Sequence, residues 1–472
     1  MRDTKMTAGK NYDDITCPFC FKTFDSETVH FKAMTLKEAG TELIALDDFS
    51  EIADEDFDFF AEAGDTEQDK TEDKSLNQLF QEKEDVLYKN FWKRYANQPE
   101  WKYANYPVIT DKDSRMMMSG YHHDADGFVD SVTDAFGEST RERICPHCHN
   151  PLPPNYGKYP VHFIATVGIT SSGKTVYLSQ LMKNMDGIMA NVGLGTLSMT
   201  EGDARFIKEH PVKKDIPLPQ GTTPGALSEP LFYVILSKGT YHTLVFYDVA
   251  GENCVDPEGM EKFGPFVEHA DGIIMILDPD QFRKVREDME DDIAGPKAVL
   301  TAMFNSFLSS KNQGGKTKVP LALTISKSDK LYNHPLISPN SNLFQEVRFD
   351  EKNQGFDPQQ YRNVMGEVRK FLRDVNEGRQ LTMILESCFE KYGLFAFTAL
   401  NCDVKEEEVV EDGVRKKVAM PVSHPSPMRI EEPLLWLLNQ FGIVKETASA
   451  QGGSGMGAGG GLFSRFFGRR SK

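Results

Sequence analysis

The residues best suited to chemistry in this chain lie at 168–175. They read Gly-Ile-Thr-Ser-Ser-Gly-Lys-Thr and match the phosphate-binding loop pattern G-x-x-x-x-G-K-[ST] at every fixed position. In such a loop, backbone N–H groups and the N-terminus of the following helix bind phosphate oxygens. Lys174 is expected to contact the β- and γ-phosphates, and the Thr175 hydroxyl to ligate Mg²⁺. A glycine-rich turn that matches the pattern by chance is the alternative.

The segments on either side of this loop are the ones that a phosphate-binding loop needs. Residues 161–167 are apolar and predict a strand, whereas residues 176–182 predict a helix. The residues expected to bind phosphate and Mg²⁺ in this region are Gly168, Ser171, Ser172, Gly173, Lys174, Thr175 and Val176.

A second motif, at 248–252, follows a predicted pair of strands. Residues 231–236 and 243–247 predict the strands, and the second runs directly into Asp-Val-Ala-Gly-Glu. An aspartate at the end of a strand beside the phosphate loop can organise Mg²⁺, so Asp248 is the expected second residue at this ion. Gly251 would let its N–H approach the γ-phosphate, where a side chain could obstruct it.

A third motif, Ser-Lys-Ser-Asp at 326–329, follows the predicted strand 319–325 and indicates binding of a base. The Asp329 carboxylate could accept hydrogen bonds from both N1–H and the N2 amino group of guanine. Adenine offers no such pair of donors. The Lys327 stem can lie along the purine face. The motif therefore favours guanine over adenine.

Strands and helices alternate from residue 161 onward, which predicts a doubly wound α/β fold. Gly272–Leu277 is apolar, as expected for a strand covered on both faces. A long helical region is expected over 281–310, a last strand over 394–397 and a closing helix over 430–441. The nucleotide-binding domain is expected to span residues 158–445.

Four of the seven cysteines form two C-x-x-C pairs, Cys17/Cys20 and Cys145/Cys148. Each pair would form a turn that directs two thiolates at one metal, and two such turns give the closed Cys₄ set of a structural Zn²⁺ site. Free thiols or a redox pair are the alternatives. The pairs lie far apart in sequence, so residues 1–24 and 143–157 are expected to form a zinc ribbon that an insertion splits. The histidines His147 and His149 are candidate substitute ligands but are expected to face solvent.

The expected insertion spans residues 25–142. Its stretch 47–72 is strongly acidic, which predicts either a solvated face or a docking surface for a basic partner. Residues 75–97 carry apolar side chains at helical spacing and predict one amphipathic helix.

Residues 446–472 are expected to form a glycine-rich linker followed by a basic amphipathic tail. Residues 462–472 combine large apolar with basic side chains. They could dock on a protein partner or on a membrane surface, or form a disordered basic end.

The formal net charge of −18 argues against general nucleic-acid binding, because phosphate backbones require a basic surface. No apolar run approaches the length of a membrane span, and the N-terminus lacks the apolar segment of a secretory signal. A cytoplasmic protein, with or without peripheral membrane attachment through the tail, is expected.

The order of motifs in residues 160–445 resembles that of the translation-factor-related GTPase superfamily, which includes the Ras-like GTPases. Together with a split N-terminal zinc ribbon and the closing helix, the chain is similar to the bacterial double-GTPase group. The resemblance implies a doubly wound P-loop NTPase sheet of the GTPase type behind a small zinc ribbon, which an acidic, partly helical insertion interrupts. Members of this group are similar to paired GTPases of multi-protein systems, some of which act in biological conflict. The resemblance therefore implies protein partners, and a second GTPase is one candidate.

The resemblance also implies roles for single residues. Asp248 would hold Mg²⁺ through water and Gly251 would sense the γ-phosphate, while Lys327 and Asp329 would read guanine. The residues whose backbone would contact the base are Thr398 and Ala399. The expected catalytic set is Lys174, Thr175, Asp248, Gly251 and Glu252.

The chain departs from the family pattern at three places. Ser326 stands where the family has Asn or Thr, which weakens the guanine assignment. Glu252 stands where Ras-like GTPases carry the Gln that positions water, so intrinsic hydrolysis is expected to be slow and to need a group from a partner. Thr223 is the preferred switch threonine within a long switch region at 176–247, while Thr222, Thr196 and Thr200 stay open.

These observations predict a protein that binds GTP or GDP and slowly hydrolyses the phosphoric anhydride of GTP with Mg²⁺. It would act as a nucleotide switch in a multi-protein assembly, with a bacterial conflict system as one setting. A nucleotide-bound scaffold without hydrolysis and a P-loop ATPase are the alternatives.

Overall fold

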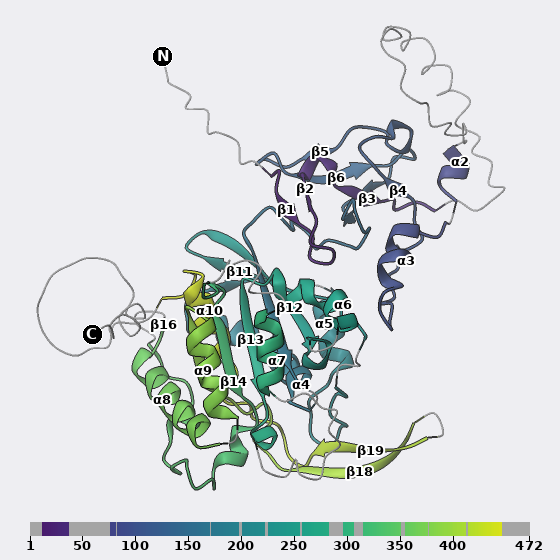
Figure 1. Cartoon of the computed structure of the whole chain (residues 1–472). Coiled ribbons are helices and arrows are strands. Elements are labelled where there is room, and N and C mark those ends of the chain that lie inside the picture. Colours follow the sequence, from purple (N-terminus) through teal and green to yellow (C-terminus); the bar gives the residue numbers. More distant parts are fainter. Residues whose placement is uncertain are drawn as a thin grey trace, which may run out of the picture.

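The computed structural model describes the greater part of the chain. The described residues are 12–36, 76–81, 83–169, 171–197, 201–221, 225–254, 257–282, 296–305, 315–350, 355–375, 377–411 and 414–445. The acidic stretch 47–72, the candidate switch residues Thr200, Thr222 and Thr223, and the tail 446–472 lie outside them. A small N-terminal module lies at one end of a larger α/β body, and a long hairpin projects near the opposite end (Figure 1).

The larger body is built on a seven-stranded sheet with the order β10-β11-β12-β9-β13-β14-β17. Its strands are β9 (Val161–Gly168), β10 (Gly195–Thr196), β11 (Leu231–Ser237), β12 (Thr240–Ala250), β13 (Gly272–Leu277), β14 (Leu321–Ile325) and β17 (Tyr392–Ala396). The pairs β12–β9, β9–β13, β13–β14 and β14–β17 are parallel. Strand β11 is antiparallel to both β10 and β12. The body is therefore a mixed α/β fold with a large, mostly parallel sheet.

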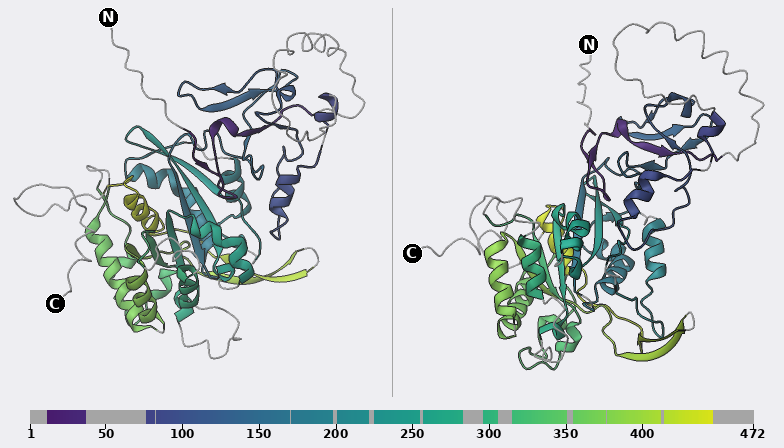
Figure 2. Two further views of the ribbon diagram at one scale, coloured as in Figure 1. Left: turned by 45° about the horizontal axis from the view of Figure 1, so that its top comes forward. Right: turned by 45° about the vertical axis from the view of Figure 1, so that its right-hand side comes forward.

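Helices cover both faces of this sheet (Figure 2). They are α4 (Lys174–Asn191), α5 (Glu201–Glu209), α6 (Pro257–Glu268), α7 (Pro296–Met303), α8 (Pro358–Asp374), α9 (Gly378–Cys388) and α10 (Glu432–Gln440). Side chains alternate along β13, so that Ile274 and Ile276 pack with α4 and α10, while Met275 packs with α6, α7 and α9. This arrangement explains why β13 is apolar at every position.

Short elements complete the larger body. They are η3 (Gly251–Cys254), η4 (Pro279–Phe282), η8 (Ser328–Leu331), η9 (Asn342–Phe344), β15 (Phe349–Asp350), β16 (Gly355–Phe356), β18 (Val404–Glu411) and β19 (Val414–Pro421). The helix expected over 281–310 is described only in part, as η4 and α7. Helix α7 begins at Pro296, because proline has no N–H to donate and is favoured in the first turn of a helix.

The N-terminal module contains three small sheets. Its strands are β1 (Ile15–Thr16), β2 (Thr23–Phe24), β3 (His30–Lys32), β4 (Val108–Ile109), β5 (His122–His123), β6 (Val129–Thr133), β7 (Ser139–Thr140) and β8 (Arg143–Ile144), with η1 (Ser26–Thr28) and η2 (Ser114–Met116) between them. Strand β3 pairs with both β4 and β8, so segments far apart in sequence share one sheet.

The single helix expected over residues 75–97 is wrong. The structure has two helices there, α2 (Leu76–Leu79) and α3 (Val86–Trp92). Asp85 caps α3 by accepting from the Tyr88 N–H, and its carboxylate also pairs with the fully buried Lys32 at 2.5 Å. These contacts fix Asp85 in an extended conformation and end any continuous helical path through it.

Among the described helices, none is both long enough and apolar enough to cross a bilayer.

Candidate functional site

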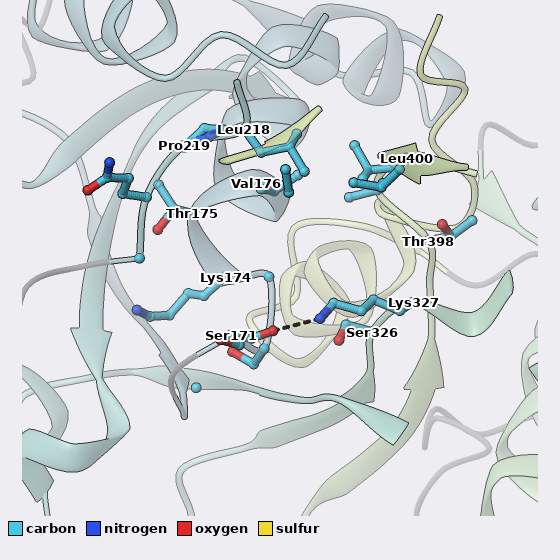
Figure 3. A pocket seen from close by; sticks show the side chains of 18 of the residues that line it. Ser171, Lys174, Thr175, Val176, Leu218, Pro219, Ser326, Lys327, Thr398 and Leu400 are labelled. Atoms are coloured by element: carbon cyan, nitrogen blue, oxygen red, sulfur yellow. Dashed lines mark hydrogen bonds between the residues drawn. The ribbon is translucent and has the colours of Figure 1, made fainter. Parts of the chain in front are cut away.

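The predicted phosphate loop lies at the carboxyl end of β9, beside a cavity of about 1150 Å³ (Figure 3). Strand β9 ends at Gly168 and α4 begins at Lys174, and the loop between them lines one wall of the cavity. A Cβ on Gly168 would lie 2.4 Å from Ser172 Oγ, and Gly173 has a φ of +83°. Both positions therefore require glycine for the loop to turn as it does.

The predicted Mg²⁺ residues lie together although they are distant in sequence. Lys174 Nζ lies 2.8 Å from Asp248 Oδ1, and the Thr175 hydroxyl donates to Asp248 Oδ2 at 3.4 Å. Strands β12 and β9 are parallel neighbours in which Asp248 is opposite Thr166, and this pairing brings the two motifs to one edge of the sheet. A hydroxyl and a carboxylate are oxygen donors of the kind that Mg²⁺ prefers.

The turn after Asp248 lies against the phosphate loop. A Cβ on Gly251 would lie 3.1 Å from the Gly168 carbonyl oxygen and 3.3 Å from the Ile169 nitrogen. Gly251 and Glu252 begin η3, directly beyond β12. Glycine at 251 thus allows the backbone of the turn to approach the loop closely.

The predicted base motif is tied to the phosphate loop by Lys327. Its Nζ donates to the Ser171 carbonyl oxygen at 2.8 Å and forms an ion pair with Asp278, and Figure 3 shows the first of these contacts. The Ser326 hydroxyl donates to the Leu277 carbonyl oxygen at 3.2 Å, inside the sheet edge. Asp329 lies half-buried on the cavity wall.

Thr398 and Ala399 lie on the same wall and are held from two sides. The Thr398 hydroxyl accepts from the Asn401 N–H at 2.9 Å, and Thr398 exchanges two backbone hydrogen bonds with Met428. The Gln180 side chain of α4 donates to the Ala399 carbonyl oxygen at 3.1 Å. Residues 398–399 and the helix of the phosphate loop are thereby joined through a buried hydrogen bond.

Two parts of the cavity wall were not expected from the sequence. One is the root of the β18–β19 hairpin, and the other is residues 218–221. The Leu218 N–H donates to the Ala419 carbonyl oxygen at 2.8 Å, so the two parts are bonded to each other. The Asp-Gly pair at 412–413, between two valine-containing runs, is a sequence signal for this hairpin. Thr196, a candidate switch residue, lies on β10 and not among the residues that line this cavity.

A candidate metal centre lies in the N-terminal module, where the sulfurs of Cys17, Cys20, Cys145 and Cys148 are all within 4.8 Å of one another. The Cys17–Cys148 and Cys20–Cys145 sulfur distances are 3.7 and 3.8 Å. Tetrahedral Zn²⁺ with Zn–S bonds of about 2.3 Å places its sulfurs about 3.8 Å apart. Two of the sulfur pairs therefore have this spacing, and the four thiols together could hold Zn²⁺.

Hydrogen-bond donors surround these sulfurs. The Phe19 and His147 N–H groups donate to Cys17 and Cys145 at 3.4 and 3.3 Å, and Asn150 Nδ2 donates to Cys148 at 3.3 Å. Such donors orient metal-bound thiolates. Burial raises the pKa of the Cys17 and Cys148 thiols. A bound cation would oppose this effect, because it favours the thiolate form.

One expectation about the neighbouring histidines is wrong. His149 does not face solvent; it is 9% exposed, and its Nδ1 donates to Asp85 at 2.9 Å. His147 is exposed, and its Nε2 lies 3.1 Å from the Thr23 carbonyl oxygen. Burial of His30, which hydrogen-bonds to His149, lowers the pKa of His30 to about 4. His149 thus connects the turn that carries Cys145 and Cys148 to α3 through Asp85.

The turn at residues 17–21, here called the first knuckle, packs against the seven-stranded sheet. The Tyr247 hydroxyl donates to the Pro18 carbonyl oxygen at 2.9 Å, and the Phe21 ring stacks on His269 at 4.4 Å between centroids. Phe21 also contacts the rings of Phe163, Tyr247 and Phe266. The turn that carries Cys17 and Cys20 therefore packs against the sheet that carries Asp248.

The described fold and the cavity are consistent with a P-loop GTPase-like α/β protein. No protein-family model matches the chain. A curated protein of Mycolicibacterium smegmatis, described as a putative ESX-1 scaffolding and assembly protein SaeC, is 28% identical over 207 residues. That match covers 40% of this chain and 51% of SaeC, so the chain spans about half the length of this relative.

Two solved structures overlap parts of the chain. The G domain of the T. maritima FeoB iron transporter matches with a TM-score of 0.18 and 12% identity over 36% of this chain and 74% of that one. A mutation variant of SsGBP matches with a TM-score of 0.21 and 14% identity over 51% of this chain and 50% of that one. These overlaps are too small to define the fold, which rests on the strand order and the loop geometry given above.

Proposed function

We propose that this chain is a GTP-binding protein that slowly hydrolyses GTP with Mg²⁺ and acts as a nucleotide switch in a multi-protein assembly. The observation that carries the proposal is the convergence of separate motifs on one cavity. Lys174 and Thr175 contact Asp248, Gly251 lies against the phosphate loop, and Lys327 reaches the loop from the base motif.

The proposed roles follow from this arrangement. The residues that would bind phosphate are Gly168, Ser171, Ser172, Gly173, Lys174, Thr175 and Val176. Thr175 and Asp248 would hold Mg²⁺, which would offset negative charge on the β- and γ-phosphates. Gly251 would donate its N–H to the γ-phosphate, and Asp329 would accept from guanine. Thr398 and Ala399 would border the base.

Slow hydrolysis follows from Glu252, which is proposed to stand where a neutral water-positioning side chain would be more effective. A carboxylate beside the γ-phosphate is repelled by it. A partner would then supply the group that speeds the reaction. The M. smegmatis relative is described as a scaffolding and assembly protein, which supports action within an assembly.

The four cysteines are proposed to bind a structural Zn²⁺ in a ribbon formed by residues 1–24 and 143–157. The division into an insertion at 25–142, a nucleotide domain at 158–445 and a tail at 446–472 is part of the same proposal. A second GTPase is one candidate partner, and the tail would dock on a partner or at a membrane surface from the cytoplasm. Thr223 stays the proposed switch residue.

Nucleotide binding by the full chain tests the proposal. Affinities for GTP, GDP and ATP would be measured with Mg²⁺, together with phosphate release in the same samples. Guanine-selective binding with slow release is expected. Binding without release would favour a nucleotide-bound scaffold, and preference for ATP would favour an ATPase.

A variant sharpens the base assignment. Asp329→Asn should weaken GTP binding and strengthen binding of xanthosine triphosphate, because the amide donates where the carboxylate accepted. Asp280→Asn, on a neighbouring surface and paired with Lys330, is the matched control and should leave the preference unchanged. An unchanged preference in Asp329→Asn would refute guanine reading by this residue.

A further inference from the structure

The N-terminal module contacts the larger body at a second place, directly after α3. The Ala96 N–H donates to the Gly225 carbonyl oxygen at 3.0 Å. Asn97 Nδ2 donates to the Leu227 carbonyl oxygen at 3.0 Å, and Asn97 Oδ1 accepts from the Leu227 N–H at 2.9 Å. The Asn97 amide thus pairs with both backbone groups of one residue, as a neighbouring β-strand would.

The segment that Asn97 holds is joined to the turn after Asp248. The Gly225 N–H donates to Asn253 Oδ1 at 3.4 Å, and Asn253 lies in η3, two residues beyond Gly251. Asn253 is 5% exposed and Leu227 is 3% exposed, whereas Asn97 itself is exposed, so the junction is buried on the side of the larger body. Residues 225–227 and η3 therefore form one hydrogen-bonded unit with Asn97.

The same part of the module also contacts the helix that follows η3. The Tyr95 hydroxyl donates to the Lys262 carbonyl oxygen at 3.4 Å, and the Tyr95 ring lies 5.6 Å from that of Phe263 in α6. The short stretch 95–97 thereby touches the chain before β11 and the chain after β12. These two segments lead into and out of the strand pair that delivers Asp248 and Gly251 to the cavity.

Side-chain length and chemistry single out asparagine at position 97. Aspartate would lose the donor and would place a negative charge beside the Leu227 carbonyl oxygen, and alanine would lose both hydrogen bonds. Gly225 has a φ of +82°, in the left-handed region that favours glycine.

We infer that Asn97 is a positioning residue for the nucleotide site, supplied by the N-terminal module. It fixes residues 225–227 against η3, which carries the turn beside the γ-phosphate position. Because Asn97 holds this segment in place before nucleotide binds, less conformational entropy is lost when a triphosphate binds. A diphosphate makes no demand on this segment, so its affinity does not depend on Asn97. The inference rests on the proposed nucleotide function.

The test compares wild-type full chain with Asn97→Ala, and with Gln98→Ala as the control at the neighbouring residue, which is exposed like Asn97. Dissociation constants are measured for GDP and for a slowly hydrolysed GTP analogue, both with Mg²⁺. Asn97→Ala should weaken the GTP analogue about tenfold, as expected for the loss of two hydrogen bonds, and change GDP by less than about twofold. Gln98→Ala should change neither constant. Thermal unfolding of both variants checks that each one folds.

Amide hydrogen exchange gives a second readout. The Leu227 amide should lose protection in Asn97→Ala and keep it in Gln98→Ala, because Asn97 Oδ1 accepts from that amide. Equal weakening of GDP and the GTP analogue, or no change in either, would overturn the positioning role. A wild-type chain that binds neither nucleotide would remove the proposed function itself, and the inference with it.

Discussion

Replacing Phe21 by alanine and by glycine should separate the packing of this side chain from the strain of its backbone. Phe21 is 8% exposed and lies among the rings of Phe163, Tyr247, Phe266 and His269. Its φ is +57°, in the left-handed region that residues with a Cβ rarely adopt. The side chain and the backbone of one residue therefore act on stability in opposite directions.

The magnitudes can be worked from these two facts. Truncating a buried phenylalanine to alanine costs about 3–5 kcal/mol. Glycine relieves a left-handed strain of about 1–2 kcal/mol. Glycine also gives the unfolded chain more freedom, which costs about 0.4–1 kcal/mol. Phe21→Gly should thus be more stable than Phe21→Ala by up to about 1.6 kcal/mol, and by about 0.8 kcal/mol at the middle of both ranges, although it is the smaller residue.

Native-state hydrogen exchange can measure this order, because it reports local opening of the knuckle rather than unfolding of the whole chain. Peptides covering residues 12–24 and 240–250 should exchange at least about 100-fold faster in Phe21→Ala than in wild type. Exchange in Phe21→Gly should be slower than in Phe21→Ala. At Phe19, which is also buried but has no positive φ, the order should be reversed. If glycine were the worse substitution at both positions, the strain argument would be wrong.

Three further predictions concern the loop, the metal and pH. Gly251→Ala should weaken GTP binding about tenfold or more, because its Cβ would lie 3.1 Å from a phosphate-loop carbonyl oxygen. The control is Gly187→Ala, whose Cβ would have no atom within 4 Å. Titration with a fluorescent nucleotide measures both variants. Cys20→Ser should lose bound Zn²⁺ and protease resistance of the N-terminal module, whereas Cys402→Ser should keep both; elemental analysis and limited proteolysis decide. Burial lowers the pKa of His162 to about 4, from about 6.5 unfolded, so the unfolded state binds the proton more tightly and the folded state loses up to about 3 kcal/mol as pH falls from 6.5 toward 4. In His162→Gln the denaturation midpoint should fall less over that range, and an unchanged pH profile would count against this shift.

The central sheet could be predicted from the sequence because its strands have strong local signals. Gly272–Leu277 is a continuous apolar run and Leu321–Ile325 is apolar except for Thr324, and each is a buried parallel strand in the structure. The phosphate loop, Asp248 and Lys327 were placed at the ends of such runs. Parallel neighbours bring those ends to one edge, so the predicted side chains meet in space.

Other features depend on contacts that no local pattern encodes. Residues 75–97 have helical periodicity, yet Asp85 divides them because it pairs with Lys32 and His149 from other segments. The glycines and prolines in residues 176–247 predict a long switch region with a mobile loop. The structure places α5 there, tied to β11 by a hydrogen bond from the Phe232 N–H to Asp203 at 2.8 Å. The contact between Asn97 and Leu227 joins two segments that carry no motif, so sequence reasoning could not find it.

The packing of the first knuckle on the large sheet has a consequence for synthesis on the ribosome. Cys17 and Cys20 are synthesised early, whereas Cys145 and Cys148 follow more than a hundred residues later. The Phe21 ring cannot pack fully until residues as distant as His269 have been synthesised. At about 5–20 residues per second, the first thiols remain without their partners for about 6–25 s, and Phe21 for about 12–50 s. During that interval the nascent N-terminus exposes two reactive sulfurs and several apolar rings. A chaperone that covers this segment, or a supply of metal timed to its completion, would then decide how much of the chain reaches the folded state.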